Sequence, residues 1–320
     1  MDKVKRFFSE LFTEIIDVTW TLYKVMVPII IVIKVVEEFG GIDILSQWLS
    51  PLMSIVGLPD EMGLVWATTL LTNIYAGLLV FMNSGVELTV AQASVLGSLM
   101  LIAHSLPIEA AIAKRAGVSM TVTLLLRLGG GLLFAWVLHQ TYQFGDLLGH
   151  QAQIIWSPEV VEQQSYLDWV WTQVENLVAI FVVISVLLFA LKLLKVLGIE
   201  KLMAIALRPI LKILGISREA TNMTIVGITL GLSFGGGLLI NEAKRGHIPA
   251  RDVFTAIMLL NLVHSMIEDT ILIMLIGADF TSIFWGRLFF GLLVVATLSR
   301  LLRGMTEETC HKYLYQPVKS

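Results

Sequence analysis

The sequence predicts an all-α polytopic membrane protein that consists of two inverted-topology repeats. Three observations lead to this fold class: an apolar composition, a match between the two halves of the chain, and the distribution of Lys and Arg. The 320 residues are 56% hydrophobic and only 15% charged, with a mean hydropathy of +0.82. Soluble domains average about 45–50% apolar and about 25% charged residues. A chain this apolar is expected to have the lipid bilayer as its main partner.

Simple counts exclude several classes of protein. The net charge of −3 predicts no nucleic-acid partner. Cys310 is the only cysteine, so the chain cannot build a disulfide framework or a thiolate metal cage by itself. It contains no Gly-x-x-x-x-Gly-Lys-Ser/Thr phosphate loop, no His-Glu-x-x-His and no Gly-x-Gly-x-x-Gly. We therefore predict that the protein is not an enzyme and that it holds no cofactor other than a bound cation.

The two halves of the chain match each other at residue types that are scarce in it. At an offset of 158 positions, the matches are Pro51/Pro209, Gly57/Gly215, Glu61/Glu219, Gly77/Gly235 and Asn83/Asn241. After a two-residue insertion the offset is 160, and the matches are His104-Ser105/His264-Ser265, Gly117/Gly277, Thr121/Thr281 and Arg127-Leu128/Arg287-Leu288. These coincidences indicate an internal duplication, and a repeat of this length is typical of the duplicated halves of transporters.

Lys and Arg residues predict the orientation of the spans, because they accumulate on the cytoplasmic side. The basic N-terminus is therefore placed inside, whereas residues 40–61 and 139–168 lack Lys and Arg and are placed outside. The same rule puts Gly117 inside but puts its match Gly277 outside, so the repeats are expected to be inverted. The location that follows is a bacterial-type inner membrane, with both termini in the cytoplasm.

Each repeat is predicted to begin with a span and an interfacial helix. Residues 1–24 are expected to form an N-terminal amphipathic helix that runs into the first span. Repeat 1 is assigned to residues 25–140, an external linker to 141–171, repeat 2 to 172–302 and a cytoplasmic tail to 303–320. The interfacial helices are expected to end at Pro51 and Pro209, one on each face of the membrane.

The next element of each repeat is predicted to be a re-entrant helical hairpin. Residues 60–87 begin and end with acids, and residues 218–251 begin and end with bases, so each segment is expected to start and finish on one side. Each arm has about half of the roughly 20 apolar residues that a full span needs. The alternative is a straight span with a glycine packing face. That alternative would place Lys114 and Arg115 outside.

A broken span follows each hairpin and precedes the final span. Residues 88–116 are expected to break at His104-Ser105-Leu106-Pro107, because Pro107 removes a backbone donor and clashes with the preceding turn. Residues 248–276 are expected to break at the matching His264, by symmetry and without a proline. The order span, interfacial helix, re-entrant hairpin, broken span and span gives six crossings in the two repeats.

The sequences around the second hairpin and the first break resemble a known family. They read Gly231-Leu-Ser-Phe-Gly-Gly-Gly-Leu-Leu-Ile-Asn-Glu-Ala-Lys and Leu101-Ile-Ala-His-Ser-Leu-Pro-Ile-Glu. They are similar to the Gate domain (nucleoside recognition domain) of concentrative nucleoside transporters, the membrane part of ferrous iron transport protein B and the spore maturation proteins. The Gate cysteines of the iron transporter and the Gln-Thr-Glu-like hairpin tip of the nucleoside transporters have no counterpart here. The resemblance implies a solute site between hairpin tips and broken helices, lined by Asn73, Gly77, His104, Ser105, Ser233, Gly235, His264 and Ser265.

Ionisable residues at membrane depth are costly, so they are functional candidates by default. The candidates are His104 with Glu109 in the first repeat, and His264 with Glu268 and Asp269 in the second. Imidazole and carboxylate groups together suit a first-row divalent metal. The predicted metal ligands are His104, Glu109, His264 and Asp269.

Two other interpretations of these residues remain open from the sequence. The histidines can relay protons near neutral pH, with Glu109, Glu268 and Asp269 as coupling groups. Alternatively, each histidine only bonds a carbonyl that its helix break leaves free. Arg127 and Arg287 are expected to pair with an acid or to extend to the membrane interface.

The predicted function is secondary transport of a small polar solute or cation by alternating access past a midplane site. A divalent metal or a proton-coupled solute ranks ahead of a nucleoside, because only Asn73-Ile74-Tyr75 offers carboxamide and aromatic contacts at a hairpin tip. The alternatives are a nucleoside transporter, or a non-transporting membrane partner or regulator like the spore maturation proteins. Assembly into a homo-oligomer is left open by the sequence.

Overall fold

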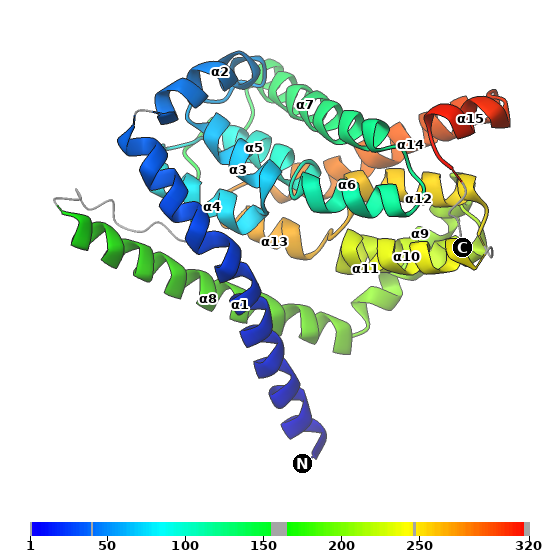
Figure 1. Cartoon of the computed structure of the whole chain (residues 1–320), viewed down its shortest axis with the longest axis horizontal. Coiled ribbons are helices and arrows are strands. Elements are labelled where there is room, and N and C mark those ends of the chain that lie inside the picture. The colour runs from blue at the N-terminus through cyan, green and yellow to red at the C-terminus, as the bar shows by residue number, and fades with distance from the viewer. Residues whose placement is uncertain (1, 40, 155–164, 246–247, 317–320) are drawn as a thin grey trace.

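The part of the chain that the structure describes is mainly helical. The computed structural model describes residues 2–39, 41–154, 165–245 and 248–316, and within these ranges extended pairing is limited to two isolated bridges, Thr89–Gln151 and Val118–Tyr315. Among the described residues, six helical segments are long and apolar enough to cross a membrane, by length and composition. The predicted all-α membrane class is therefore confirmed (Figure 1).

Both halves of the chain contain helices in the same order. The first half consists of α1 (Asp2–Glu38), α2 (Gly41–Ile55), α3 (Met62–Leu71), α4 (Ile74–Ser84), α5 (Val90–Ile102), α6 (Leu106–Arg115) and α7 (Met120–Gly145). The second half consists of α8 (Tyr166–Val196), α9 (Ile199–Ile213), α10 (Arg218–Leu230), α11 (Leu232–Lys244), α12 (Ala250–Val263), α13 (Glu268–Met274), the π-helix η1 (Thr281–Gly286) and α14 (Arg287–Arg303). A short helix, α15 (Glu307–Tyr313), follows.

The backbone conformation also repeats at the matched positions. Residues with positive φ occur in three matched pairs: Gly57 and Gly215 (72° and 84°), Ser105 and Ser265 (49° and 46°), and Gly117 and Gly277 (84° and 80°). Helices α2 and α9 end at residues that are themselves 158 positions apart, Ile55 and Ile213. These coincidences support the duplication at the level of local structure.

The helix ends predicted at the two repeated prolines differ from the structure, whereas the N-terminal helix runs into the first span as expected. Helix α1 is continuous over Asp2–Glu38, and the apolar stretch that can cross a membrane begins at Lys5, so the domain boundary after residue 24 stays a prediction. Glu14 and Asp17 interrupt the apolar pattern but not the helix, because neither residue type breaks helical hydrogen bonding. Pro51 and Pro209 lie inside α2 and α9, four residues before the helix ends. A proline removes one hydrogen bond, and a helix can continue beyond it with a kink.

The broken helices form the inside of the molecule, and the long helices surround them. In the most apolar 18-residue stretch of α5–α6, 67% of the residues are buried, and in that of α12–α13, 78% are buried. The corresponding share is only 17% in both α1 and α8. Helix α5 packs against α7, α12 packs against α14 and α7, and α1 packs against α8. Figure 1 shows α1 and α8 crossing each other on one side of the molecule. Their exposed apolar surfaces are therefore suited to contact with lipid.

Helices α3 and α4 form one helical hairpin, and α10 and α11 form the other. The arms approach closely at a glycine of the second arm. A Cβ atom on Gly77 would collide with Oγ1 of Thr69, and one on Gly235 would lie 2.5 Å from the backbone nitrogen of Gly227. Thr69 and Gly227 are themselves matched positions. Gly77 and Gly235 therefore have a packing role, and their role in lining a solute path stays a prediction.

Both helix breaks are hydrogen-bonded to the hairpin that precedes them. The N–H of Ser105 donates to the carbonyl oxygen of Thr69 at 3.1 Å, and the N–H of Ser265 donates to that of Gly227 at 3.4 Å. The Ser105 hydroxyl also donates to the carbonyl oxygen of Thr72 at 2.6 Å. A left-handed backbone costs a residue with a Cβ roughly 1–2 kcal/mol. These hydrogen bonds between segments offset that cost, also at the second break, which has no proline.

Candidate cation-binding site

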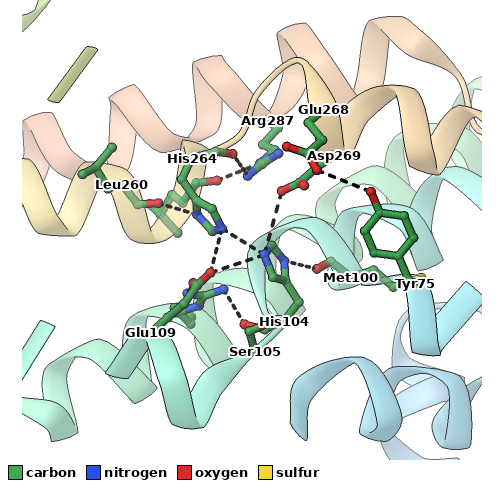
Figure 2. A network of polar contacts seen from close by, with 12 residues as sticks. Tyr75, Met100, His104, Ser105, Glu109, Leu260, His264, Glu268, Asp269 and Arg287 are labelled. Atoms are coloured by element: carbon green, nitrogen blue, oxygen red, sulfur yellow. Dashed lines mark hydrogen bonds and ion pairs between the residues drawn. The ribbon is translucent and has the colours of Figure 1, made fainter. Parts of the chain in front are cut away.

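The two helix breaks bring His104 and His264 into contact in the interior of the molecule (Figure 2). The two Nε2 atoms lie 3.0 Å apart, and the ring centroids are 4.8 Å apart at an interplanar angle of 53°. Both side chains are buried, with 7% and 1% of the residue surface exposed. Each half of the chain contributes one ring, so the pair lies at the junction of the two halves.

The other ring nitrogen of each histidine identifies its tautomer. Nδ1 of His104 lies 2.9 Å from the carbonyl oxygen of Met100, and Nδ1 of His264 lies 2.7 Å from that of Leu260. A carbonyl oxygen only accepts, so both Nδ1 atoms carry a proton and donate it. In a neutral ring, Nε2 is then an acceptor with a lone pair. The 3.0 Å contact therefore directs two lone pairs at each other unless a cation is shared between them.

Two buried carboxylates direct further acceptors at this pair, from the first turns of α6 and α13. Oε1 of Glu109 lies 3.1 Å from Nε2 of His264 and 3.4 Å from Nε2 of His104. Oδ2 of Asp269 lies 3.8 Å from Nε2 of His104 and has no hydrogen-bond partner among the described residues. The four residues predicted as metal ligands thus converge. For three of them, His104, Glu109 and His264, one ligand atom each lies within 4.8 Å of the others.

Two fully buried arginines hold the backbone around the histidines. The Nη2 atoms of Arg127 and Arg287 donate to the carbonyl oxygens of His104 and His264, each at 2.8 Å. Arg127 also forms an ion pair with Oε2 of Glu109, which leaves Oε1 for the histidines. Arg287 instead donates from Nε to a second carbonyl oxygen of α12 at 2.8 Å. Each arginine thus satisfies a carbonyl group that the helix break leaves without an intrahelical partner.

The other predicted site residues make different contacts. The Tyr75 hydroxyl donates to Oε1 of Glu268 at 3.4 Å, so this carboxylate is bonded to α4 and lies beside the histidine cluster (Figure 2). Asn73 caps α4, because its side chain accepts a hydrogen bond from the N–H of Ala76 at 2.9 Å. The side chain of Ser233 lies outside the part of the structure that is described. A solute-binding role for these residues stays a prediction.

From the sequence, Tyr75 is expected only as an aromatic contact for a nucleoside at a hairpin tip, and neither arginine is placed in the site. The expected ion pair with an acid is found for Arg127. Neither arginine extends to the interface, since both have 0% of their surface exposed. The missed signal was their coincidence in the repeat, because an arginine at membrane depth is a functional candidate on the same grounds as a histidine. Tyr75 offered no such signal, since its match is Ser233.

Residues 231–235 read Gly-Leu-Ser-Phe-Gly, which is the Gly-x-Ser-x-Gly spacing of hydrolase nucleophile elbows. That motif exposes its serine on a sharp turn between a strand and a helix. Here the five residues join α10 to α11 and continue into α11, and a helix takes the place of the strand. The motif therefore lacks the structural context that gives it its chemistry. The prediction that the protein is not an enzyme stays a prediction.

The six membrane-capable segments and the buried polar centre define a polytopic membrane protein with a candidate cation-binding site. The chain is similar to a protein of Bacillus subtilis (strain 168) described as "Uncharacterized membrane protein YvoD", with 24% identity over 273 residues. The match covers 81% of this chain and 83% of that protein. No protein-family model and no solved structure matches the chain. The likeness supports the membrane class and extends to no named activity.

Proposed function

We propose that the protein is a secondary transporter that moves a small cation, or a polar solute coupled to one, across the membrane. The observation that carries the proposal is the buried group of three acceptors at the junction of the two halves. Nε2 of His104, Nε2 of His264 and Oε1 of Glu109 lie within 3.4 Å of one another. Buried acceptors that face only each other are unfavourable. A cation bound among them removes this cost.

The charges around the three acceptors are compatible with an added cation. The two guanidinium groups of Arg127 and Arg287 are matched in number by the buried carboxyl groups of Glu109 and Asp269, and Glu268 adds a third carboxyl group nearby. The surroundings therefore carry no excess positive charge that would repel the cation. Buried charges need opposite charges or hydrogen bonds close by, which Arg127 has in Glu109 and Arg287 has in the carbonyl oxygens of Leu262 and His264.

The position of the cluster suits alternating access because the two halves share it. His104 belongs to the first half and His264 to the second, and only noncovalent contacts join the rings. A movement of one half against the other would separate the rings and weaken cation binding. Such a difference in affinity between two states is what couples a ligand to a conformational equilibrium.

The proposal includes the membrane arrangement expected from the sequence. The two halves are inverted, Gate-like repeats, the hairpins α3–α4 and α10–α11 are re-entrant, and both termini are cytoplasmic. Irregular backbone at membrane depth is tolerated where it is buried in protein or lines a cavity. The buried breaks at His104 and His264 meet this condition.

Ion flux in proteoliposomes tests the proposal. The purified protein is reconstituted around a pH-sensitive, a sodium-sensitive or a metal-quenched dye, and H⁺, Na⁺, Mn²⁺, Co²⁺ and Zn²⁺ are added outside in turn, each with the dye that reports it. We expect the native protein to conduct at least one of these cations. His104→Gln and His264→Gln should each lower the flux by about tenfold or more, the size of effect that the loss of a metal-site partner has.

The matched control is His150→Gln, which removes an exposed imidazole and should leave the flux unchanged. A native protein that moves none of the five cations would contradict the proposal. So would folded His264→Gln protein with the same flux as His150→Gln. Either result would favour a non-transporting membrane partner or regulator.

A further inference from the structure

The three acceptor atoms of the cluster are spaced like the ligands of a single ion. The triangle formed by Nε2 of His104, Nε2 of His264 and Oε1 of Glu109 has edges of 3.0, 3.1 and 3.4 Å. With metal–ligand bonds of about 2.0–2.1 Å, neighbouring ligands lie about 2.9 Å apart at octahedral angles and about 3.3 Å apart at tetrahedral angles. One ion can therefore contact all three atoms with little movement of the chain.

Each of the three ligand atoms is also oriented from behind. Metal-binding histidines almost always donate their other ring N–H to a carbonyl or carboxylate, which fixes the tautomer and the ring plane. Both histidines do so here, through Nδ1 to the carbonyl oxygens of Met100 and Leu260. Glu109 is held by the ion pair between its Oε2 atom and Arg127. These partners leave two Nε2 atoms and one Oε1 atom facing the same point.

We infer that the cation transported under the proposed function is a divalent first-row transition metal, bound by His104, His264 and Glu109. Two imidazole nitrogens and one carboxylate oxygen form a donor set that suits such ions and leaves coordination positions open. Mg²⁺ and Ca²⁺ instead prefer oxygen ligands, and two of the three nearest donors here are nitrogen. The metal is cargo in this scheme and not a resident cofactor.

A metal ion accounts for the geometry more completely than a shared proton. A proton on one Nε2 atom satisfies a single contact at a time, whereas a metal ion coordinates all three acceptors together. Three protein ligands leave the shell incomplete, unlike the four of a closed structural site. A further acceptor, Oδ2 of Asp269, lies 3.8 Å from Nε2 of His104. An ion in such an open shell can exchange, as transported cargo must.

Binding of Co²⁺ to the full-length, chelator-treated protein in detergent tests the inference without requiring transport. Bound cobalt is counted by equilibrium dialysis, and its visible absorption reports the ligand set. We expect about one Co²⁺ per chain, as for a single metal centre. His264→Gln and Glu109→Gln should each weaken binding about tenfold or more. His150→Gln should bind like the native protein, and Mg²⁺ should not compete.

Thermal unfolding of the native protein keeps the test valid if a variant fails to fold. Co²⁺ should raise the unfolding temperature of the native protein and of His150→Gln, because it binds only the folded state. An equal concentration of Mg²⁺ should not. Absence of both Co²⁺ binding and stabilisation in the native protein would overturn the inference. Equal binding by folded His264→Gln protein would overturn it as well.

The outcomes separate this inference from the transport proposal on which it rests. Histidine-dependent flux of H⁺ or Na⁺ in a protein that does not bind Co²⁺ would leave transport standing and refute the metal. Co²⁺ binding that His264→Gln weakens, in a protein without flux of any cation, would support the metal site and refute transport.

Discussion

Consecutive glycines in α11 make it possible to test the packing of the second hairpin with two closely matched substitutions. A Cβ atom on Gly235 would lie 2.5 Å from the backbone nitrogen of Gly227 and 2.9 Å from the carbonyl oxygen of Met223. A Cβ atom on Gly237 would meet nothing within 4 Å. The atoms near Gly235 belong to the backbone of α10, so no side chain can rotate away. Gly235→Ala therefore requires α10 and α11 to separate, and Gly237→Ala does not.

The size of the effect follows from this geometry. Ordinary van der Waals contact begins at 3.4 Å, and the Cα atom of Gly227 is nearer still than its backbone nitrogen, so the arms must separate by at least about 0.9 Å at this point. Such a gap forfeits about a quarter to a half of the contact energy of the atoms concerned. Overpacking substitutions typically cost about 1–3 kcal/mol. Both variants gain the same helix propensity of alanine over glycine, about 1 kcal/mol. The difference between their free energies of unfolding is therefore expected to be about 1–3 kcal/mol.

The assay is unfolding of the two purified variants in detergent, followed by tryptophan fluorescence, with ion flux measured in parallel. Gly235→Ala should be the less stable protein, and Gly237→Ala should be at least as stable as the native chain. Equal stability of the two variants would refute the packing account. Loss of flux in Gly235→Ala at unchanged stability would instead place this glycine in the solute path, as the family resemblance implies.

Other perturbations test the ion pair, the topology and the histidine contact. Arg127→Met leaves Glu109 as a buried unpaired charge and should lower the free energy of unfolding by about 3–5 kcal/mol; a loss below about 1 kcal/mol would contradict this pairing. In a Cys310→Ser background, cysteines introduced at Asp60 and Ser84 should react with an impermeant reagent from the same face of vesicles, and labelling from opposite faces would show a straight span. The change in the free energy of unfolding of the double variant His104→Gln/His264→Gln should differ from the sum of the two single changes by about 0.5–3 kcal/mol. A double variant that equals the sum would argue against direct contact between the two rings.

Residue types alone predict the helical class, the duplication and the position of both breaks. The apolar composition is enough to predict a helical membrane protein. Pro107 is enough to predict the first break, because a proline interrupts a helix whatever the helix packs against. The second break lacks a proline and could be placed only because His264 repeats His104 at a constant offset. Its left-handed serine is stabilised by a hydrogen bond to α10, which no local pattern contains. The first turns of the two final spans also differ, although their positions match. The first begins as the regular α-helix α7, whereas the second begins with the π-helix η1.

The functional centre depends on how the two halves pack against each other. The same two breaks are compatible with imidazoles that meet and with imidazoles that face lipid, because the sequence does not specify the relative placement of segments 160 residues apart. Packing also distinguishes the two matched carboxylates. Glu109 approaches both histidines and Arg127, whereas the shorter Asp269 comes no closer than 3.8 Å to Nε2 of His104. These contacts join side chains from helices that are far apart in the sequence. They therefore form only when the tertiary structure packs those helices against each other.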